Sequence, residues 1–416
     1  MQRKTVFSKD FILVAIGQII SIFGNQVLRY ALPLYLLNQT GSSALFGTTM
    51  AFSFIPMVLL FPIGGIIADR VNKRNIMVIL DFGTAFLIFL FCLLLGKVEI
   101  VPLMVGAMML LCGIQGAYQP AVKASVPVLV EAKYIMKANA VVDVINSVAS
   151  MVGPVIGGLL FSVFGLTPIL HISVGCFFAS AVMEIFIHIP FQKKKAEGNI
   201  FTIGANDLKD SFHFMVKRQP VLWKSSLIFA ASNLLLTALI LIGLPVIITQ
   251  RLGFAPDTAN RLYGYSQGTV AAGAVLGGLL AGILSGKLTA KADPVLLVGC
   301  ALCTALCGIA LQALRSPMGI YLVLSVSSGL LLTLHTIFQI RMMTCLQRLT
   351  PRDLIGKVIS CFICVVMCTS PLGQALYGFV FAHIGNSTYL PFYAAALIMT
   401  GIGIATRRVF YGLDRL

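Results

Sequence analysis

Charged residues are scarce in this chain: they make up 11% of its 416 residues, with 14 Asp and Glu against 30 Lys and Arg. A water-soluble domain normally has about 25% charged residues, so a soluble globular fold is excluded. The sequence also lacks a zinc-binding His pair, a phosphate-binding loop with lysine, and a nucleophile with a base at usable spacing. We therefore predict that the chain is not an enzyme, hydrolyses no ATP and needs no cofactor.

Cysteines are absent from the polar segments, because all ten lie in apolar runs. This distribution argues against an extracellular disulfide framework. Two triplets share a spacing that places three thiols on one helix face, a pattern that metal ligands can also show: Cys300, Cys303 and Cys307, then Cys361, Cys364 and Cys368. We interpret both as small packing residues and predict no metal site.

Apolar residues dominate instead, at 58% of the chain with a mean hydropathy of +0.96. A helix needs about 20 apolar residues to cross a bilayer. Twelve runs qualify: 11–36, 44–68, 76–96, 101–122, 139–164, 166–188, 222–250, 262–286, 294–314, 317–345, 358–384 and 387–406. We predict an all-α integral membrane protein with twelve transmembrane helices.

The positive charge follows the predicted topology. With the N-terminus inside, the cytoplasmic segments hold 23 Lys and Arg residues and the external loops hold 4. Such a bias orients membrane proteins, so we predict a multi-pass protein of the plasma (inner) membrane with both termini cytoplasmic. The basic charge then serves orientation and contact with anionic lipid rather than nucleic-acid binding.

The second half of the sequence repeats the first, which predicts two similar bodies. At an offset of 220, Gln119 matches Gln339, Lys137 matches Lys357 and Gly153 matches Gly373. Gly64-Gly65 recurs as Gly277-Gly278 and Leu32-Pro33 as Leu244-Pro245. We predict six-helix bundles at 1–189 and 221–416, joined by a cytoplasmic linker at 190–220 that carries a short amphipathic helix with Leu208, Phe212 and Met215 on one face.

A cationic loop at residues 64–74 lies between the second and third apolar runs. Its pattern, G-x-x-x-D-R-x-x-K/R-R, resembles the signature loop of the major facilitator superfamily of secondary transporters. The resemblance implies alternating access to a central cavity and a gating role for Gly65, Asp69, Arg70, Lys73 and Arg74. Asp81 is close enough along the third span to pair with Arg70, Lys73 or Arg74, and we count it with the gate.

A second motif, in the fifth span, resembles the antiporter signature of the same superfamily. Gly153-Pro154 is followed by Gly157-Gly158, with Ala149 and Ala140 where that signature has two more glycines. The motif gives a helix with a missing hydrogen bond and a bare face, and it is typical of exporters. Plain helix packing is the alternative interpretation of these four residues.

Polar residues within the spans predict the walls of the cavity. In the first span Gln18, Ser21, Asn25 and Arg29 share one helical face, although Arg29 alone could also reach the external headgroups. The pseudo-two-fold repeat sets Gln115 and Gln119 opposite His335 and Gln339, and Asn25 and Arg29 opposite Ser226, Asn233 and Thr237. Asn146 and Gln374 complete the predicted lining.

The branch and coupling ion are predicted from the same resemblance. Asn25 before Ala31-Leu32-Pro33, with Pro120, Pro127 and Ala138-Asn139, is most similar to macrolide-efflux proteins and enterobactin-type siderophore exporters. The resemblance implies that the proton gradient drives transport. Many such exporters have an arginine where this chain has Cys112, so the proton carrier must be sought elsewhere. The candidates are Asp143, Glu184 and His335.

The substrate is predicted to be a small neutral, zwitterionic or anionic amphiphile, because no acid lies deep in the predicted cavity while Arg29 lies in its outer half. Three alternatives stay open: an uptake symporter of the same fold, a lysophospholipid transporter, and a non-transporting membrane receptor or scaffold. The predicted partners are the substrate, protons and membrane lipid, and the chain is expected to act as a monomer.

Overall fold

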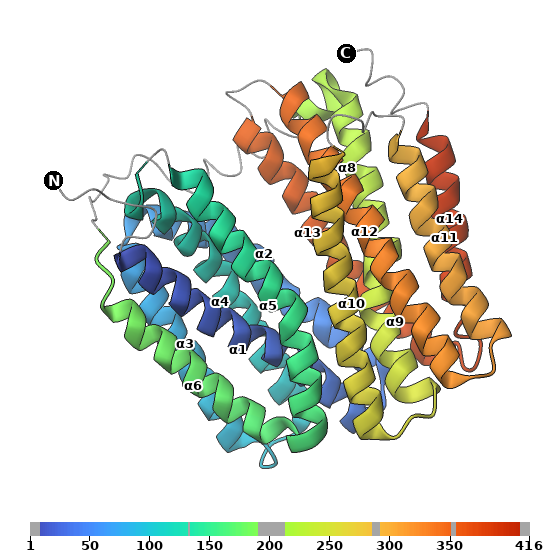
Figure 1. The fold of residues 1–416 in the computed structure, drawn as a ribbon, viewed down its shortest axis with the longest axis horizontal. Helices are drawn as coiled ribbons and strands as arrows, with labels where there is room; N and C mark the ends of the chain where they lie inside the picture. The colour runs from blue at the N-terminus through green and yellow to red at the C-terminus, as the bar shows by residue number, and fades with distance from the viewer. Residues whose placement is uncertain (1–8, 132–133, 190–212, 285–291, 351–354, 408–416) are drawn as a thin grey trace. The chain divides into compact units, whose positions relative to one another are not determined.

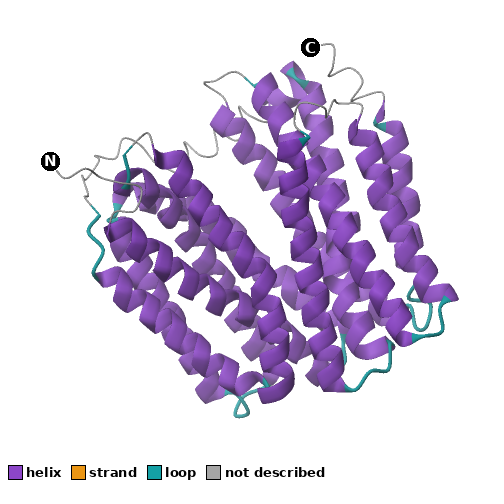
Figure 2. Cartoon of the chain, viewed as in Figure 1, coloured by secondary structure: helices purple, strands orange, loops and turns teal. Residues whose placement is uncertain are grey.

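The computed structural model describes residues 9–131, 134–189, 213–284, 292–350 and 355–407. Every regular element within these residues is a helix (Figure 2). Eleven of the helices are long and apolar enough to cross a membrane, and a shorter apolar helix covers Leu390–Ala405. The prediction of an all-α membrane protein is therefore confirmed.

The N-terminal half contributes six long helices. They are α1 (Lys9–Thr40), α2 (Ser43–Arg70), α3 (Lys73–Leu94), α4 (Ile100–Leu129), α5 (Ile135–Phe164) and α6 (Leu166–Ile185). Short turns separate them, and three of these turns contain a glycine with positive φ: Gly41 at +61°, Gly96 at +81° and Gly165 at +72°. Residues with a Cβ rarely adopt this conformation. The Asn72 side chain caps α3 by accepting a hydrogen bond from the Arg74 N–H at 3.1 Å.

The C-terminal half begins with a helix interrupted by π-turns. Its elements are η2 (Phe214–Arg218), α8 (Pro220–Ser232), η3 (Asn233–Thr237), α9 (Ala238–Val246), η4 (Ile247–Arg251), α10 (Pro256–Ile283), α11 (Ala292–Ala313), α12 (Pro317–Leu349), α13 (Ile355–His383) and α14 (Leu390–Ala405). Helices α8 and α9 with η3 and η4 form one span over Pro220–Arg251. The amphipathic helix was predicted within the linker at 190–220. Residues 190–212 of this linker lie outside the described residues.

Contacts divide the chain into two compact units (Figure 1). The first comprises residues 1–41, 49–197 and 255–268, and the second comprises residues 42–48, 198–254 and 269–416. In the first unit α1 packs on α4, α5 and α6, while α3 packs on α4 and α6. In the second unit α11 packs on α12 and α14, while α13 packs on α8, η3 and α9. The predicted domain boundary at 190–220 stays a prediction.

Large apolar side chains lie on the outward faces of both units. Ile79 and Phe86 of α3 are each 67% exposed and Leu397 of α14 is 77% exposed. Extended apolar surface of this kind is unfavourable in water and is typical of helices in contact with lipid. The outward faces of α3 and α14 thus have the apolar character expected of helices that span a membrane.

Candidate functional site

Two carboxyl side chains are buried inside the first unit, Asp81 of α3 and Glu184 of α6, which are 2% and 0% exposed. The Ser21 hydroxyl of α1 donates to Asp81 Oδ1 at 3.2 Å. The Tyr118 hydroxyl of α4 donates to Glu184 Oε1 at 2.8 Å, and the Gln18 amide of α1 donates to the Tyr118 oxygen at 2.7 Å. The "carboxylate cluster" is hereafter the following group: Gln18, Ser21, Asp81, Tyr118, Ser180 and Glu184.

Close approach of α1 and α6 positions this cluster. A Cβ on Gly17 would lie 3.4 Å from Ser180 Oγ and 3.6 Å from Glu184 Cγ, so a glycine there leaves space for both side chains. The Ser180 hydroxyl donates to the Gly17 carbonyl at 3.0 Å and also lies next to the Asp81 carboxyl group. Ser180 and Glu184 are four residues apart, so both face α1.

The cations near the cluster are bound elsewhere. Arg74, at the start of α3, donates from its guanidinium to the Ile185 carbonyl at the end of α6, where the helix dipole is negative. Among the described side chains, neither Lys73 nor Arg74 forms an ion pair with Asp81. The expected pairing of Asp81 is therefore wrong for these two residues, because Asp81 lies two turns further along α3 and contacts α1 and α6.

Three atoms of the cluster are buried and have no hydrogen-bond partner among the described residues: Asp81 Oδ2, Glu184 Oε2 and Gln18 Oε1. An ionised carboxylate without a cation is costly to bury, and an acceptor without a donor adds to that cost. A proton on either carboxyl group removes a charge and turns an acceptor into a donor. The arrangement is chemically suited to binding a proton.

The polar stripe predicted along α1 divides into a buried and an exposed part. Gln18, Ser21 and Asn25 are buried, whereas Arg29 is exposed. Gln18 and Ser21 belong to the carboxylate cluster. Arg29 lies close enough to Cys112 of α4 to act on it electrostatically, so a cation from α1 is present near the position where similar exporters have an arginine.

The polar residues of α4 and α5 are only partly enclosed. Gln115 and Gln119 are half-buried, and so is Asn146, whose amide donates to the Val142 carbonyl at 2.9 Å. Asp143, a candidate proton carrier, is exposed. Its exposure distinguishes it from Glu184, which is enclosed on all sides by the first unit.

The glycine motif of α5 allows close contact with α1 and α10. A Cβ on Gly153 would lie 2.5 Å from the Gln26 Cβ of α1, and one on Gly158 would lie 3.0 Å from the Gly264 Cα of α10. A Cβ on Gly157 would lie 3.3 Å from the ring of Tyr30. These distances support the packing interpretation of the motif, and its gating role, with that of Pro154, stays a prediction.

The signature loop is described in part. The side chains of Gly65, Asp69 and Arg70 lie outside what the structure describes, so their predicted gating roles stay predictions. Lys73 and Arg74 are half-buried, and the Ile185 carbonyl contact of Arg74 joins α3 to α6.

The second unit has a separate polar group around His335 of α12. His335 Nε2 lies 3.0 Å from the Ser232 hydroxyl, and its ring stacks on Phe229 at a centroid distance of 5.3 Å. Thr237 Oγ1 is buried and has no hydrogen-bond partner in the described parts of the chain, and the Asn233 amide donates to the Phe229 carbonyl at 3.3 Å. The π-turn η3 thus carries both Asn233 and Thr237.

Two further predicted residues of the second unit differ in burial. Gln374 is buried and donates to the Ser370 hydroxyl at 3.1 Å, whereas Gln339 is exposed. The predicted cavity combines these residues with residues of the first unit, and it stays a prediction.

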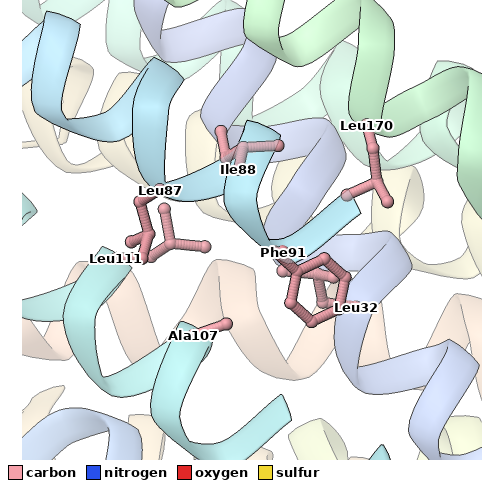
Figure 3. A pocket seen from close by; sticks show the side chains of 7 residues that line it. All are labelled: Leu32, Leu87, Ile88, Phe91, Ala107, Leu111 and Leu170. Carbon is pink, nitrogen blue, oxygen red and sulfur yellow. The ribbon is translucent and has the colours of Figure 1, made fainter. Parts of the chain in front are cut away.

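A small apolar pocket lies beside α1, α3, α4 and α6 in the first unit (Figure 3). Its volume is about 10 Å³, which is room for about one water molecule. Its lining is wholly apolar: Leu32, Leu87, Ile88, Phe91, Ala107, Leu111 and Leu170. The pocket is too small for an amphiphilic substrate.

The sequence from residue 14 to residue 373 matches the family model of the Major Facilitator Superfamily. The chain belongs to this superfamily. The expected family is therefore confirmed, and with it a transporter that binds small molecules.

Relatives of this Major Facilitator protein include exporters. An uncharacterized MFS-type transporter, YfiS of Bacillus subtilis, is 25% identical over 410 residues, covering 95% of this chain and 92% of YfiS. Macrolide efflux protein A of Streptococcus pyogenes is 27% identical over 192 residues, 46% of this chain and 47% of that protein. The structure of a bacterial homologue of the human lysosomal transporter Spinster has a TM-score of 0.71 at 13% identity, with 99% and 98% of the two chains covered, and shows the shared fold.

Three members of the polar sites in this Major Facilitator chain were missed from sequence. Tyr118 lies between Gln115 and Gln119 and looks like an apolar span residue, and Ser180 is a small residue of a type common in membrane helices. The third is Asp293, which receives two hydrogen bonds from Arg341. The spacing of Ser180 and Glu184 by one helical turn was the available signal for a shared polar face.

Proposed function

We propose that this chain is a proton-driven exporter that moves a small neutral, zwitterionic or anionic amphiphile by alternating access. The observation that carries the proposal concerns Glu184. Its side chain is buried, accepts a hydrogen bond from the Tyr118 hydroxyl, and is bonded to no cation among the described side chains. A carboxyl group in this setting is neutral when protonated and strongly disfavoured when charged, so proton binding and conformation are linked. Glu184 is the proposed proton carrier.

The distribution of charge supports a substrate that is not a simple cation. The carboxyl groups of Asp81, Glu184 and Asp293 are each at most 2% exposed, so we do not expect them to contact a cationic substrate. Arg29 is an exposed cation in the second half of α1, where it favours an anionic or zwitterionic ligand.

The direction of transport is proposed from the relatives and from α5. Macrolide efflux protein A is named as an efflux protein, and its similarity to this chain covers 46% of the residues. The second argument is the resemblance of Gly153-Pro154 and Gly157-Gly158 in α5 to the antiporter signature of exporters. Both observations favour export over uptake.

Accumulation of a radiolabelled macrolide in an efflux-deficient bacterial strain tests this proposal. Cells that express the protein should accumulate less macrolide than vector controls, and a protonophore should remove the difference. Equal accumulation with and without the protein would overturn export of this class. Equal protection against a cationic dye would overturn the proposed charge preference.

The substrate itself is best sought with purified protein. Thermal stabilisation by members of a panel of antibiotics, siderophores and lysolipids would show which class binds. Stabilisation by lysolipids alone would favour the lysophospholipid alternative over antibiotic or siderophore export.

A further inference from the structure

The carboxylate cluster contains two acids on different helices, and this feature goes beyond a single proton carrier. Glu184 and Asp81 act on each other electrostatically, and both act on the Tyr118 hydroxyl. Ser21 approaches both Asp81 and Tyr118. The two carboxyl groups therefore lie in one buried polar cluster inside the first unit.

Among the side chains that the structure describes on the surrounding helices, no cation bonds to the carboxyl groups of this cluster. Near the ends of α1 and α3, Asp10 accepts a hydrogen bond from the His188 N–H and Arg74 donates to a backbone carbonyl. The other charged side chains described on the packed helices lie towards helix ends or are exposed: Lys9, Arg29, Lys73, Lys123, Lys137 and Asp143. The interactions acting on Asp81 and Glu184 come from Ser21, Ser180, Tyr118 and the two acids themselves.

Two like charges in one apolar enclosure repel each other, and each also loses its hydration. Within the described part of the chain, one oxygen of each carboxyl group, Asp81 Oδ2 and Glu184 Oε2, has no hydrogen-bond partner, and neither has Gln18 Oε1. One proton on the pair removes the repulsion and supplies a donor for an unpaired acceptor. A fully deprotonated pair is stable only if water or a movement of the helices separates the charges.

We propose that Asp81 and Glu184 form one ionisable unit that holds a single shared proton in this conformation, with Tyr118 as the residue that positions it. The coupling role of this pair rests on the proposed function. Release of the proton leaves two negative charges in the same buried cluster and favours a conformation in which α1, with Gln18 and Ser21, no longer encloses them. Proton occupancy is thereby linked to the packing of α1 on α4 and α6.

A proton fits the cluster better than an alkali ion. The Gln18 amide donates to the Tyr118 oxygen, and the Tyr118 hydroxyl donates to Glu184. The hydrogen atoms of these bonds lie where a metal ion would have to approach the oxygen lone pairs. Sodium binding is therefore the competing outcome that the experiment must separate.

Infrared titration of the full chain in vesicles of phosphatidylethanolamine and phosphatidylglycerol tests the pair without a substrate. The wild-type protein should show the band of a buried protonated carboxyl group at neutral pH. In Asp81→Asn and in Glu184→Gln the titration midpoint of the remaining group should differ from the wild-type value by at least about one pH unit, as expected for coupled sites. The double variant should lose the band. Glu99→Gln, an exposed loop position, is the matched control and should leave it unchanged.

Three outcomes would overturn the pair. The first is a carboxyl band that survives in the double variant. The second is a titration midpoint in each single variant that equals the wild-type value. The third is loss of the wild-type band when sodium replaces choline at constant pH. Tyr118→Phe, which keeps the ring and removes the hydroxyl, should change the midpoint while gel filtration and thermal stability show a folded protein. An unchanged midpoint in Tyr118→Phe would refute its positioning role.

A transport measurement separates this inference from the proposed function. With a radiolabelled macrolide as probe in proteoliposomes, both Asp81→Asn and Glu184→Gln should retain exchange between equal pools but lose accumulation driven by a pH gradient, by about tenfold or more. If wild-type protein moves no macrolide but shows the expected infrared pattern, export is refuted and the pair stands. If wild-type export is proton-driven and Asp81→Asn remains fully coupled, the pair is refuted.

Discussion

Arg341 of α12 binds Asp293 of α11 through two hydrogen bonds, from Nε to Oδ1 at 2.6 Å and from Nη2 to Oδ2 at 3.1 Å. The pair is largely buried, with side-chain exposures of 17% and 3%. A bidentate contact of this kind fixes the start of α11 against α12. In the first unit, by contrast, no described cation forms an ion pair with the carboxylate cluster.

Breaking this ion pair should destabilise the second unit. Asp293→Ala leaves the Arg341 charge buried without its carboxylate, and a loss of about 3 kcal/mol in the free energy of unfolding is expected. Thermal unfolding of the purified protein measures the loss. The double variant Asp293→Ala with Arg341→Met should recover much of it, because it removes both charges. A single variant with wild-type stability would show that the pair contributes little.

The close contact of α5 with α10 makes a second prediction. Gly158→Ala places a methyl group 3.0 Å from the Gly264 Cα and 3.2 Å from the Asn260 carbonyl, so α5 must move and the unfolding free energy should fall by about 1–3 kcal/mol. Gly175→Ala on α6 is the control, since a Cβ there meets nothing within 4 Å and alanine favours a helix by about 0.5–1 kcal/mol. Equal behaviour of the two variants would contradict tight packing at Gly158.

The predicted gate of the signature loop can be tested at Asp69. Asp69 is the next-to-last residue of α2, and charges near helix ends have effects of about 0.3–2 kcal/mol. Asp69→Asn should abolish transport of the macrolide probe without loss of folded protein in the membrane. Flux at the wild-type rate in this variant would end the gating hypothesis.

His335 should behave differently from Glu184. Its ring stacks on Phe229 and bonds to Ser232 in the interior of the second unit, an arrangement that serves packing. His335→Gln should therefore lower stability by about 1–3 kcal/mol and still couple macrolide transport to the pH gradient, whereas Glu184→Gln should uncouple it. The ratio of accumulation with and without a pH gradient measures coupling in both variants. Loss of coupling in His335→Gln would instead assign proton coupling to His335 of the second unit and would contradict the account.

Most of the fold could be predicted from the sequence, because the length of an apolar run and the number of Lys and Arg residues in a loop can be read from each segment alone. The predicted run 166–188 corresponds to α6, Leu166–Ile185, and the run 387–406 to α14, Leu390–Ala405. The interruption of the seventh span at Asn233–Thr237 was not predictable, since π-turns depend on packing around the helix.

The candidate site was predictable only residue by residue. Gln18, Ser21 and Glu184 were identified as polar positions in apolar helices, but the contact between α1, α3, α4 and α6 that joins them depends on tertiary packing. Periodicity assigns a residue to a helix face and not to a neighbour. For that reason Asp81 was expected to meet a nearby cation, and Tyr118, which links Gln18 to Glu184, was overlooked.

Proton-driven flux in proteoliposomes tests the central claim most directly. Purified wild-type protein should accumulate a radiolabelled macrolide against its concentration gradient when a pH gradient is imposed, and a protonophore should abolish the accumulation. Glu184→Gln should retain only exchange between equal pools. Flux that is the same with and without the pH gradient would contradict the account.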